Sequence, residues 1–333
     1  MFYYYLSLSL KSISHQKSLS VLISSTLGLG IAACMITYSL IYLMSKDPLP
    51  HKSERVFHIQ LDNWSLNDAA ISPDLPPEEV TWVDAVNIVN AKQAKFQAAH
   101  AITWGMVTPA DNNIPPFLGI IRATHGEFFP MLDVPFLFGE AWQNYPTNQA
   151  EYVTILSKST NQRIFGGSNS IGQTLPMLGQ LFTVVGVLDE WHPSPKFFDM
   201  SFGKFYPPED LYVPLQIKAE LELPHGGNSQ CWQTDIGDNY QSFLNSECVN
   251  FNLWIEISSQ KDKQLFEDYL WSYIEQQKSL GRFPKKTNNI VLNINQWLAY
   301  KEIVSSDMYV FFNLALLFLI VCLFNAASLI STK

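Results

Sequence analysis

Hydrophobic and polar positions divide the chain into three parts. Residues 19–44 and 308–332 contain no formally charged side chain, whereas the segment between them mixes short apolar runs with polar turns. About 20 consecutive apolar residues cross a hydrocarbon core of roughly 30 Å as a helix, and helices of soluble domains keep charge on an outer face. The pattern predicts transmembrane helices at 19–44 and 308–332, with a folded domain at 45–307 between them.

The first apolar run has a second interpretation, a cleaved signal peptide. It is longer than the roughly 7–15 residues of a signal-peptide core, and no clear small-x-small cleavage site follows it, so a membrane span is favoured. Within this run, Ser24, Gly28 and Ala32 recur at every fourth position. Small residues at that spacing let another helix approach closely, although Gly and Ala are also frequent in membrane helices generally. Both interpretations of these candidate packing residues stay open.

The central segment shows the periods of both strands and helices. Phe251, Leu253 and Ile255 alternate with polar or bulky residues, which is the period of a half-buried strand, and residues 262–280 carry apolar side chains at helical spacing. A second helix is expected at 77–91, which opens with Pro and two Glu. Other strands are expected at 56–61, 152–156, 182–188, 211–214 and 290–294. Mixed elements predict an α+β fold, and about 260 residues favour two subdomains over a single core.

The charged residues follow the same division into two apolar ends and a central segment. All 30 acidic residues lie within 47–307, and 18 of the 21 Lys and Arg lie within 46–301, so the segment 46–307 carries 18 − 30 = −12. A nucleic-acid-binding protein would need a basic face, so no nucleic-acid partner is predicted. Lys11 and Lys17 precede the first span without any acid, and this bias places both termini in the cytoplasm and the acidic domain outside. The Tyr-rich residues 1–18 are interpreted as an interfacial helix on the cytoplasmic leaflet.

Two of the four cysteines lie in the central segment. Cys231 and Cys248 are 17 residues apart in a polar stretch with little periodicity. In an oxidising compartment a disulfide between them is the natural interpretation; free thiols and a metal site with His225 are the alternatives, although the spacing matches no zinc pattern. The other two cysteines stand inside the predicted spans.

Catalytic signals are absent from the sequence. It contains no His-Glu-x-x-His pair, no Gly-x-Ser-x-Gly elbow and no Walker loop. Asp189 and Glu190 stand at a strand end as a possible acid–base pair, but adjacent residues on a strand face opposite ways. We therefore expect no enzyme, no catalytic residues, no cofactor and no bound metal.

Several short motifs, in a fixed order, resemble the periplasmic core domain of MacB/FtsX-like ABC transporter permeases. The family's Thr-His-Gly-Glu-Phe-Phe type helix appears at 124–129, and Gly139-Glu140 stands where Gly-Arg is usual. The remaining motifs are Ser157 to Phe165-Gly166, Ile171-Gly172 to Leu175, Val185-Gly186-Val187, and the strand Asp210–Leu215 with its Tyr-Val-Pro-Leu sequence. With the flanking spans, the resemblance covers nearly the whole chain.

The resemblance implies an α+β periplasmic domain with porter-like and sabre-like subdomains, the inserted one at roughly 117–215, flanked by two transmembrane helices. It implies a bacterial inner-membrane protein whose partners are a cytoplasmic ABC ATPase subunit, a second permease copy or homologue, the lipid bilayer and, as a further candidate, a periplasmic adaptor protein. ATP-driven closure of the spans would move the periplasmic domain for export or mechanotransmission. The joints 46–50 and 304–308 would then matter most.

One departure from the family concerns the number of spans. The family permease has four, and the given sequence reaches only two. We expect a truncated gene product, a fragment of a longer permease, or a permease half whose remainder is encoded separately. The competing interpretation is a two-span membrane-anchored sensor or binding protein whose periplasmic ectodomain binds a ligand.

Overall fold

The computed structural model describes residues 17–66, 75–142, 151–227, 229–232, 236–285 and 288–331. It forms two units, described separately below: the membrane unit (1–46 with 299–333) and the ectodomain (47–298). Nearly all of the interfacial helix expected at 1–18 lies outside the described residues.

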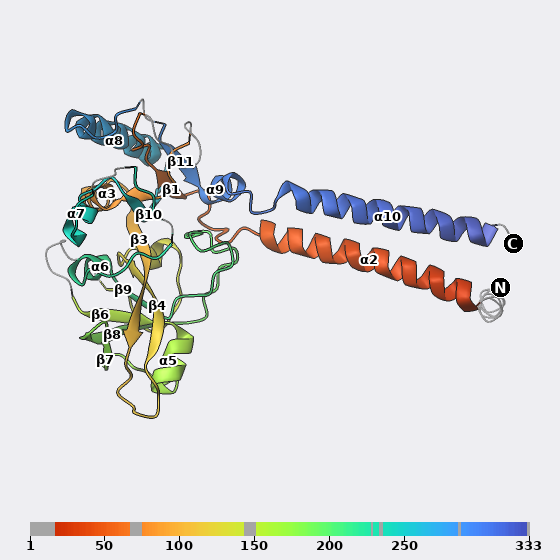
Figure 1. The fold of residues 1–333 in the computed structure, drawn as a ribbon, viewed down its shortest axis with the longest axis horizontal. Coiled ribbons are helices and arrows are strands. Elements are labelled where there is room, and N and C mark those ends of the chain that lie inside the picture. The colour runs from red at the N-terminus through yellow and green to blue at the C-terminus, as the bar shows by residue number, and fades with distance from the viewer. Residues whose placement is uncertain are drawn as a thin grey trace. The chain divides into compact units, whose positions relative to one another are not determined.

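The membrane unit is a pair of long apolar helices. Helices α2 (Lys17–Ser45) and α10 (Ser306–Ser331) run antiparallel and side by side (Figure 1). Both are long and apolar enough to cross a membrane, close to the expected 19–44 and 308–332. They meet at Gly30, where an added Cβ would lie 3.1 Å from Leu319 Cδ1, because the missing side chain lets α10 approach closely.

The ectodomain is built on one sheet, to which the eleven strands of the described residues belong. In spatial order the main path is β11-β1-β10-β3-β4-β9-β6-β8-β5. The strands are β1 (Val56–Gln60), β2 (Val80–Thr81), β3 (Phe96–Val107), β4 (Phe117–Thr124), β5 (Phe136–Gly139), β6 (Val153–Leu156), β7 (Thr174–Met177), β8 (Gln180–Leu188), β9 (Leu211–Pro214), β10 (Val249–Glu256) and β11 (Ile290–Asn293). The helices are α3 (Trp82–Ala91), α4 (Phe128–Met131), α5 (Lys158–Phe165), α6 (Leu215–Glu220), α7 (Tyr240–Leu244), α8 (Gln260–Ser279) and α9 (Ile294–Tyr300).

Strand β7 closes part of this sheet into a ring. It pairs with β8 along its whole length and with the end of β3 through Val107 and Met177. The strands β3, β4, β9, β6, β8 and β7 thus follow one another around a closed path. Most of this ring comes from residues 117–215, and the division of the ectodomain into two subdomains stays a prediction.

All of the strands expected from the sequence are present, as is the helix at 262–280, which is α8. The helix expected at 77–91 begins later, at Trp82. Residues 80–81 instead pair with β10, and the hydroxyl of Thr81 accepts a hydrogen bond from the amide of Asp84, which caps α3. The long hairpin of β3 and β4, which is the most extended feature of the ectodomain (Figure 1), was not predicted from the sequence.

One face of the sheet carries the apolar core. Alternate residues of the central strands, such as Phe57, Leu253 and Ile121, pack with buried side chains of α3, α6 and α8, such as Ile88 and Phe266. Burial of a side chain of this size contributes about 1.5–3 kcal/mol, so this layer is the main source of stability.

The opposite face is buried as well, and here the sequence-based expectation was wrong. Every residue of β10 is buried, including Trp254, although its alternation predicted a half-buried strand. An irregular segment covers this face: the carbonyl oxygen of Phe198 accepts a 3.0 Å hydrogen bond from Trp254 Nε1. The Pro-rich stretch 192–208 therefore contains a covering layer. Residues 195–201 of this layer are called the strap segment below.

Candidate functional site

The two ends of the ectodomain are hydrogen-bonded to each other. Residues 47–55, called the entry segment, follow α2 in the sequence, and α9 precedes α10. The amide of Ile294 donates to the carbonyl oxygen of Ser53 at 3.1 Å. The carboxylate of Glu54 accepts from Asn293 Nδ2 at 2.7 Å and from Asn295 Nδ2 at 3.1 Å. A displacement of either chain end would thus reach the same point of the domain.

The entry segment is also anchored to the sheet. Lys52 Nζ lies 2.6 Å from Asp133 Oδ1 and 3.3 Å from Glu256 Oε2, and it donates to the carbonyl oxygen of Pro130 at 2.6 Å. Glu256 is fully buried on β10 and also pairs with Lys95 at 2.8 Å. Lys52, which makes these contacts, lies just beyond the joint expected at 46–50.

The entry segment has a local turn that fixes its own shape. Ser53 donates through its hydroxyl to Asp47 and to the carbonyl oxygen of Leu49, and Asp47 Oδ1 accepts from the amide of Leu49 at 2.9 Å. At the other expected joint, 304–308, the amide of Met308 donates to the carbonyl oxygen of Ser305 at 3.0 Å. Both joints thus have regular local hydrogen bonding.

The strap segment is held by donors from three different elements. Trp297 Nε1 of α9 donates to the carbonyl oxygen of Phe197 at 2.8 Å, and Trp254 of β10 donates to that of Phe198. Asp199 Oδ2 accepts from Arg122 on β4 at 2.8 Å. Because the segment forms no strand, these side-chain donors take the place of ladder hydrogen bonds.

Arg122 is the centre of a buried charge network. It is fully buried, with Nε 2.7 Å from Glu209 Oε1 and one terminal nitrogen 2.7 Å from His100 Nδ1. Lys196 Nζ lies 2.9 Å from Glu209 Oε1. The network contains two cations and, with Asp199, two carboxylates, so its formal charges balance when His100 is neutral.

The pKa values of this network follow from burial and pairing. Burial works to raise the pKa of Asp199 and Glu209, but the nearby charge of Arg122 outweighs it and holds both pKa values below their usual range. Burial, reinforced by the charge of Arg122, lowers the pKa of His100 well below its usual value. The carboxylates therefore stay ionised and His100 stays neutral near pH 7.

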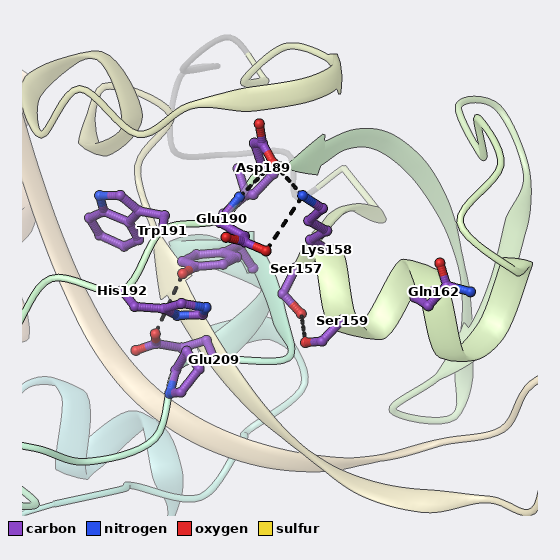
Figure 2. A pocket seen from close by; sticks show the side chains of 12 residues that line it. Ser157, Lys158, Ser159, Gln162, Asp189, Glu190, Trp191, His192 and Glu209 are labelled. Carbon is purple, nitrogen blue, oxygen red and sulfur yellow. Dashed lines mark hydrogen bonds and ion pairs between the residues drawn. The ribbon is translucent and has the colours of Figure 1, made fainter.

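A pocket of about 470 Å³ opens beside the strap segment (Figure 2). The first turn of α5, the residues after β8 and the start of β9 line it. Lys158 Nζ lies 2.9 Å from Asp189 and 3.7 Å from Glu190. Trp191 forms another part of the wall. The volume of the pocket falls within the range of small-molecule sites.

The pair Asp189 and Glu190 differs from the expectation that adjacent strand residues diverge. Strand β8 ends at Leu188, so neither residue is constrained by the strand period, and both reach Lys158 (Figure 2). Lys158 thereby neutralises part of their charge. Among the described residues, no group of three or more His, Cys, Asp or Glu is arranged to hold a metal ion.

The candidate packing residues of the first span lie away from the contact between the two helices. Ser24, Gly28 and Ala32 are exposed in the helix pair, and an added Cβ at Gly28 would meet no atom of the described residues within 4 Å. Gly30, two positions along, makes the contact with Leu319 instead. The small-residue stripe is thus not covered by α10.

Cys231 and Cys248 are joined by a disulfide in the structure, with their Cα atoms 4.3 Å apart. The bridge ties the stretch that contains α7 to the start of β10. His225, the metal-site alternative, instead lies 2.6 Å from Asn250 through Nδ1 and stacks on Tyr240. Cys34 and Cys322 are free thiols in the two apolar helices.

The family model of the MacB-like periplasmic core domain matches residues 20–270, which is well over half of the chain. The chain belongs to this family. As a MacB-like periplasmic core domain with an apolar helix on either side, it is a component of the ABC-type transporter permease family, and this membership fits the inner membrane.

Solved structures with related descriptions match at low identity. The periplasmic region of MacB from Actinobacillus actinomycetemcomitans is 13% identical (TM-score 0.45), covering 78% of this chain and 96% of that one. A domain of a putative permease protein from Porphyromonas gingivalis is 11% identical (TM-score 0.46; 74% and 92%). The extracellular domain of the noncanonic ABC-type transporter YknZ from Gram-positive bacteria is 12% identical (TM-score 0.38; 63% and 88%). Among curated proteins, none matches.

Proposed function

We propose that this chain is a permease subunit, or part of one, that couples a cytoplasmic ABC ATPase to movement of its periplasmic domain, for export or mechanotransmission. Both termini would lie in the cytoplasm, and the acidic ectodomain would lie in the periplasm. The proposal assigns no catalytic step to this chain; ATP hydrolysis belongs to the partner.

The observation that carries the proposal is the joining of the two ectodomain ends. Ser53 and Ile294 share a main-chain hydrogen bond, and Glu54 accepts from Asn293 and Asn295. A ligand-binding domain tethered passively to a membrane needs no such connection between its ends. A domain that is moved by its spans does, because independent displacements of two ends would deform it without transmitting a directed motion.

A membrane partner is supported by the open face of α2. The helix pair uses Gly30 for its own contact and leaves Ser24, Gly28 and Ala32 uncovered. Small residues at this spacing support close helix packing in a bilayer. A second permease copy or homologue, or further spans, would supply the missing helix, and a periplasmic adaptor remains a further proposed partner of the ectodomain.

The proposal is tested by isolating the protein from native membranes. The full chain, tagged and extracted in mild detergent, should bring down a cytoplasmic protein with a Walker motif, and the complex should hydrolyse ATP. The variant Gly28→Leu should reduce recovery of the membrane partner proposed to pack on Ser24, Gly28 and Ala32. Recovery of no ATPase in several detergents and in native lipid particles would contradict the proposal.

A second function is favoured by one observation, the pocket of Figure 2. A volume of about 470 Å³ and a lining of both charged and aromatic residues suit a polar ligand. A two-span sensor or binding protein would use such a pocket directly. Ligand binding without an ATPase partner would support this alternative.

A further inference from the structure

Trp297 connects α9 to the strap segment through one well-defined hydrogen bond. Its indole Nε1 donates to the carbonyl oxygen of Phe197 at 2.8 Å, and both side chains are almost fully buried. Helix α9 is the last element of the ectodomain before the chain continues into α10. Any displacement of α9 therefore acts on Phe197 through a buried hydrogen bond that is shielded from water.

The next residue of the strap segment touches the wall of the pocket. The ring of Phe198 is stacked on that of Trp191, with centroids 5.1 Å apart and planes 15° from parallel. Trp191 lines the pocket of Figure 2. Two successive contacts, Trp297 to Phe197 and Phe198 to Trp191, thus lead from α9 to the pocket.

The strap segment is also held to the sheet, at the carbonyl oxygen of Phe198 and at Asp199. Trp254 donates to the carbonyl oxygen of Phe198, and Arg122 binds Asp199 while its guanidinium lies 4.8 Å from the centroid of the Phe198 ring. β4 and β10 are interior strands of the sheet. With the Phe198 carbonyl and Asp199 held in place, movement of α9 would rotate the Phe197–Phe198 pair about these anchors rather than carry the whole segment along.

The pocket shares a residue with the buried charge network. Glu209, which pairs with Arg122 and Lys196, lines the pocket together with Tyr212. Its wall thus has one part anchored by buried charge and another part, Trp191, supported by the strap segment. A wall of this kind changes shape when only one part is displaced.

We propose that Trp297 is a positioning residue which, through Phe197 and Phe198, sets the place of Trp191 in the pocket wall, so that displacement of α9 reshapes the pocket. The source of that displacement in the cell rests on the proposed function. The link itself does not, because it lies wholly within the ectodomain.

The link is tested by 19F NMR of the full chain in detergent, with its nine tryptophans replaced by 5-fluorotryptophan. The variant Trp191→Phe assigns the Trp191 resonance. Trp297→Phe, which keeps an aromatic ring and removes the indole donor, should shift that resonance and leave those of distant tryptophans in place. The matched control is Trp82→Phe. The ring of Trp82 packs on that of Phe251, with centroids 5.4 Å apart, in the apolar layer on the other face of the sheet. This variant should leave the Trp191 resonance unchanged.

A second variant tests the route. Phe198→Leu removes the stacked ring and should itself shift the Trp191 resonance. In that background Trp297→Phe should have no additional effect on Trp191. An unchanged Trp191 resonance in folded Trp297→Phe, or an equal shift with and without the Phe198 ring, would overturn the proposal. No ATPase is needed for this experiment, so its failure would leave the permease proposal standing, and absence of an ATPase partner would leave the link standing.

Discussion

The main-chain amide of Ile294 donates a 3.1 Å hydrogen bond to the carbonyl oxygen of Ser53. These residues are 241 positions apart in the sequence, one in the entry segment and the other at the start of α9. Around this bond, Glu54 binds Asn293 and Asn295, and Lys52 binds Asp133 and Glu256. The ectodomain thus receives both of its chain ends at one point that is tied to its sheet.

The hydrogen bonds of Glu54 should stabilise the place where the two ends of the ectodomain meet. Glu54→Ala removes the acceptor of two amide hydrogen bonds, each worth about 0.5–1.5 kcal/mol, and Glu54 is exposed. We expect a loss of about 1 kcal/mol in stability and faster hydrogen exchange of the α9 amides. Glu275→Ala on α8, which removes an exposed pair with Lys278, is the control and should leave α9 exchange unchanged. Equal exchange in both variants would contradict this role of Glu54.

Arg122 should be far more important for stability than any exposed basic residue. Arg122→Met leaves Asp199 and Glu209 buried without their main counter-charge, and removal of one partner from a buried pair costs about 3–5 kcal/mol. Lys158→Met breaks only exposed ion pairs, which contribute about 0–1 kcal/mol each. Denaturant unfolding of the two variants measures the difference. Similar midpoints would show that the buried network contributes little.

The ectodomain should lose stability at moderately acidic pH. Burial lowers the pKa of His125 to about 4 from its usual 6.5, with Nδ1 3.2 Å from the amide of Ala99. The unfolded chain therefore binds a proton between these pH values that the folded chain does not, so the contribution of His125 to stability is complete above pH 6.5 and is lost as the pH falls towards 4. The shift corresponds to about 3 kcal/mol.

This pH dependence has a direct control. His125→Asn keeps an acceptor for the Ala99 amide but cannot titrate, so it should flatten the part of the stability curve between pH 6.5 and 4. An unaltered pH profile in His125→Asn would show that other groups account for the acid sensitivity.

The two glycines of α2 should respond differently to the same substitution. Gly30→Leu inserts a side chain where α10 lies within van der Waals contact, whereas an added Cβ at Gly28 meets no atom of the described residues within 4 Å. Chemical cross-linking of residues of α2 to residues of α10 should therefore fail in Gly30→Leu, because the inserted side chain separates the two helices. It should persist in Gly28→Leu. Association with a partner helix should fail in Gly28→Leu. Normal complex formation by Gly28→Leu would remove the small-residue stripe from the partner contact.

Much of this architecture is predictable from the sequence, because the spans and most strands have a strong hydrophobic period. The helix α8 and the strands β1, β8 and β10 are local features of that kind. The opposite face of the sheet is not predictable in this way. Its cover is an irregular Pro-rich segment held by Trp297, Trp254 and Arg122, and no local period indicates that two indoles and a guanidinium converge on one stretch of backbone.

The buried charges were missed for a related reason. Arg122 and Glu209 are 87 positions apart, and in sequence each resembles an ordinary surface residue. The hairpin strand that carries Arg122 was not recognised, because its residues lack a clean alternation. The pairing of Asp189 and Glu190 with Lys158 likewise depends on where β8 ends, at Leu188, and boundaries are poorly determined by sequence periodicity alone.

The measurement that tests the central claim most directly is the distance between two spin labels across the ectodomain while the ATPase turns over. With the full chain reconstituted in lipid with the ATPase that co-purifies with it, one label on the exposed face of α8 and one near α5 should report different distance distributions with ATP and without nucleotide. The variant Glu54→Ala should reduce that difference. Identical distributions under both conditions, in a complex that hydrolyses ATP, would contradict the account.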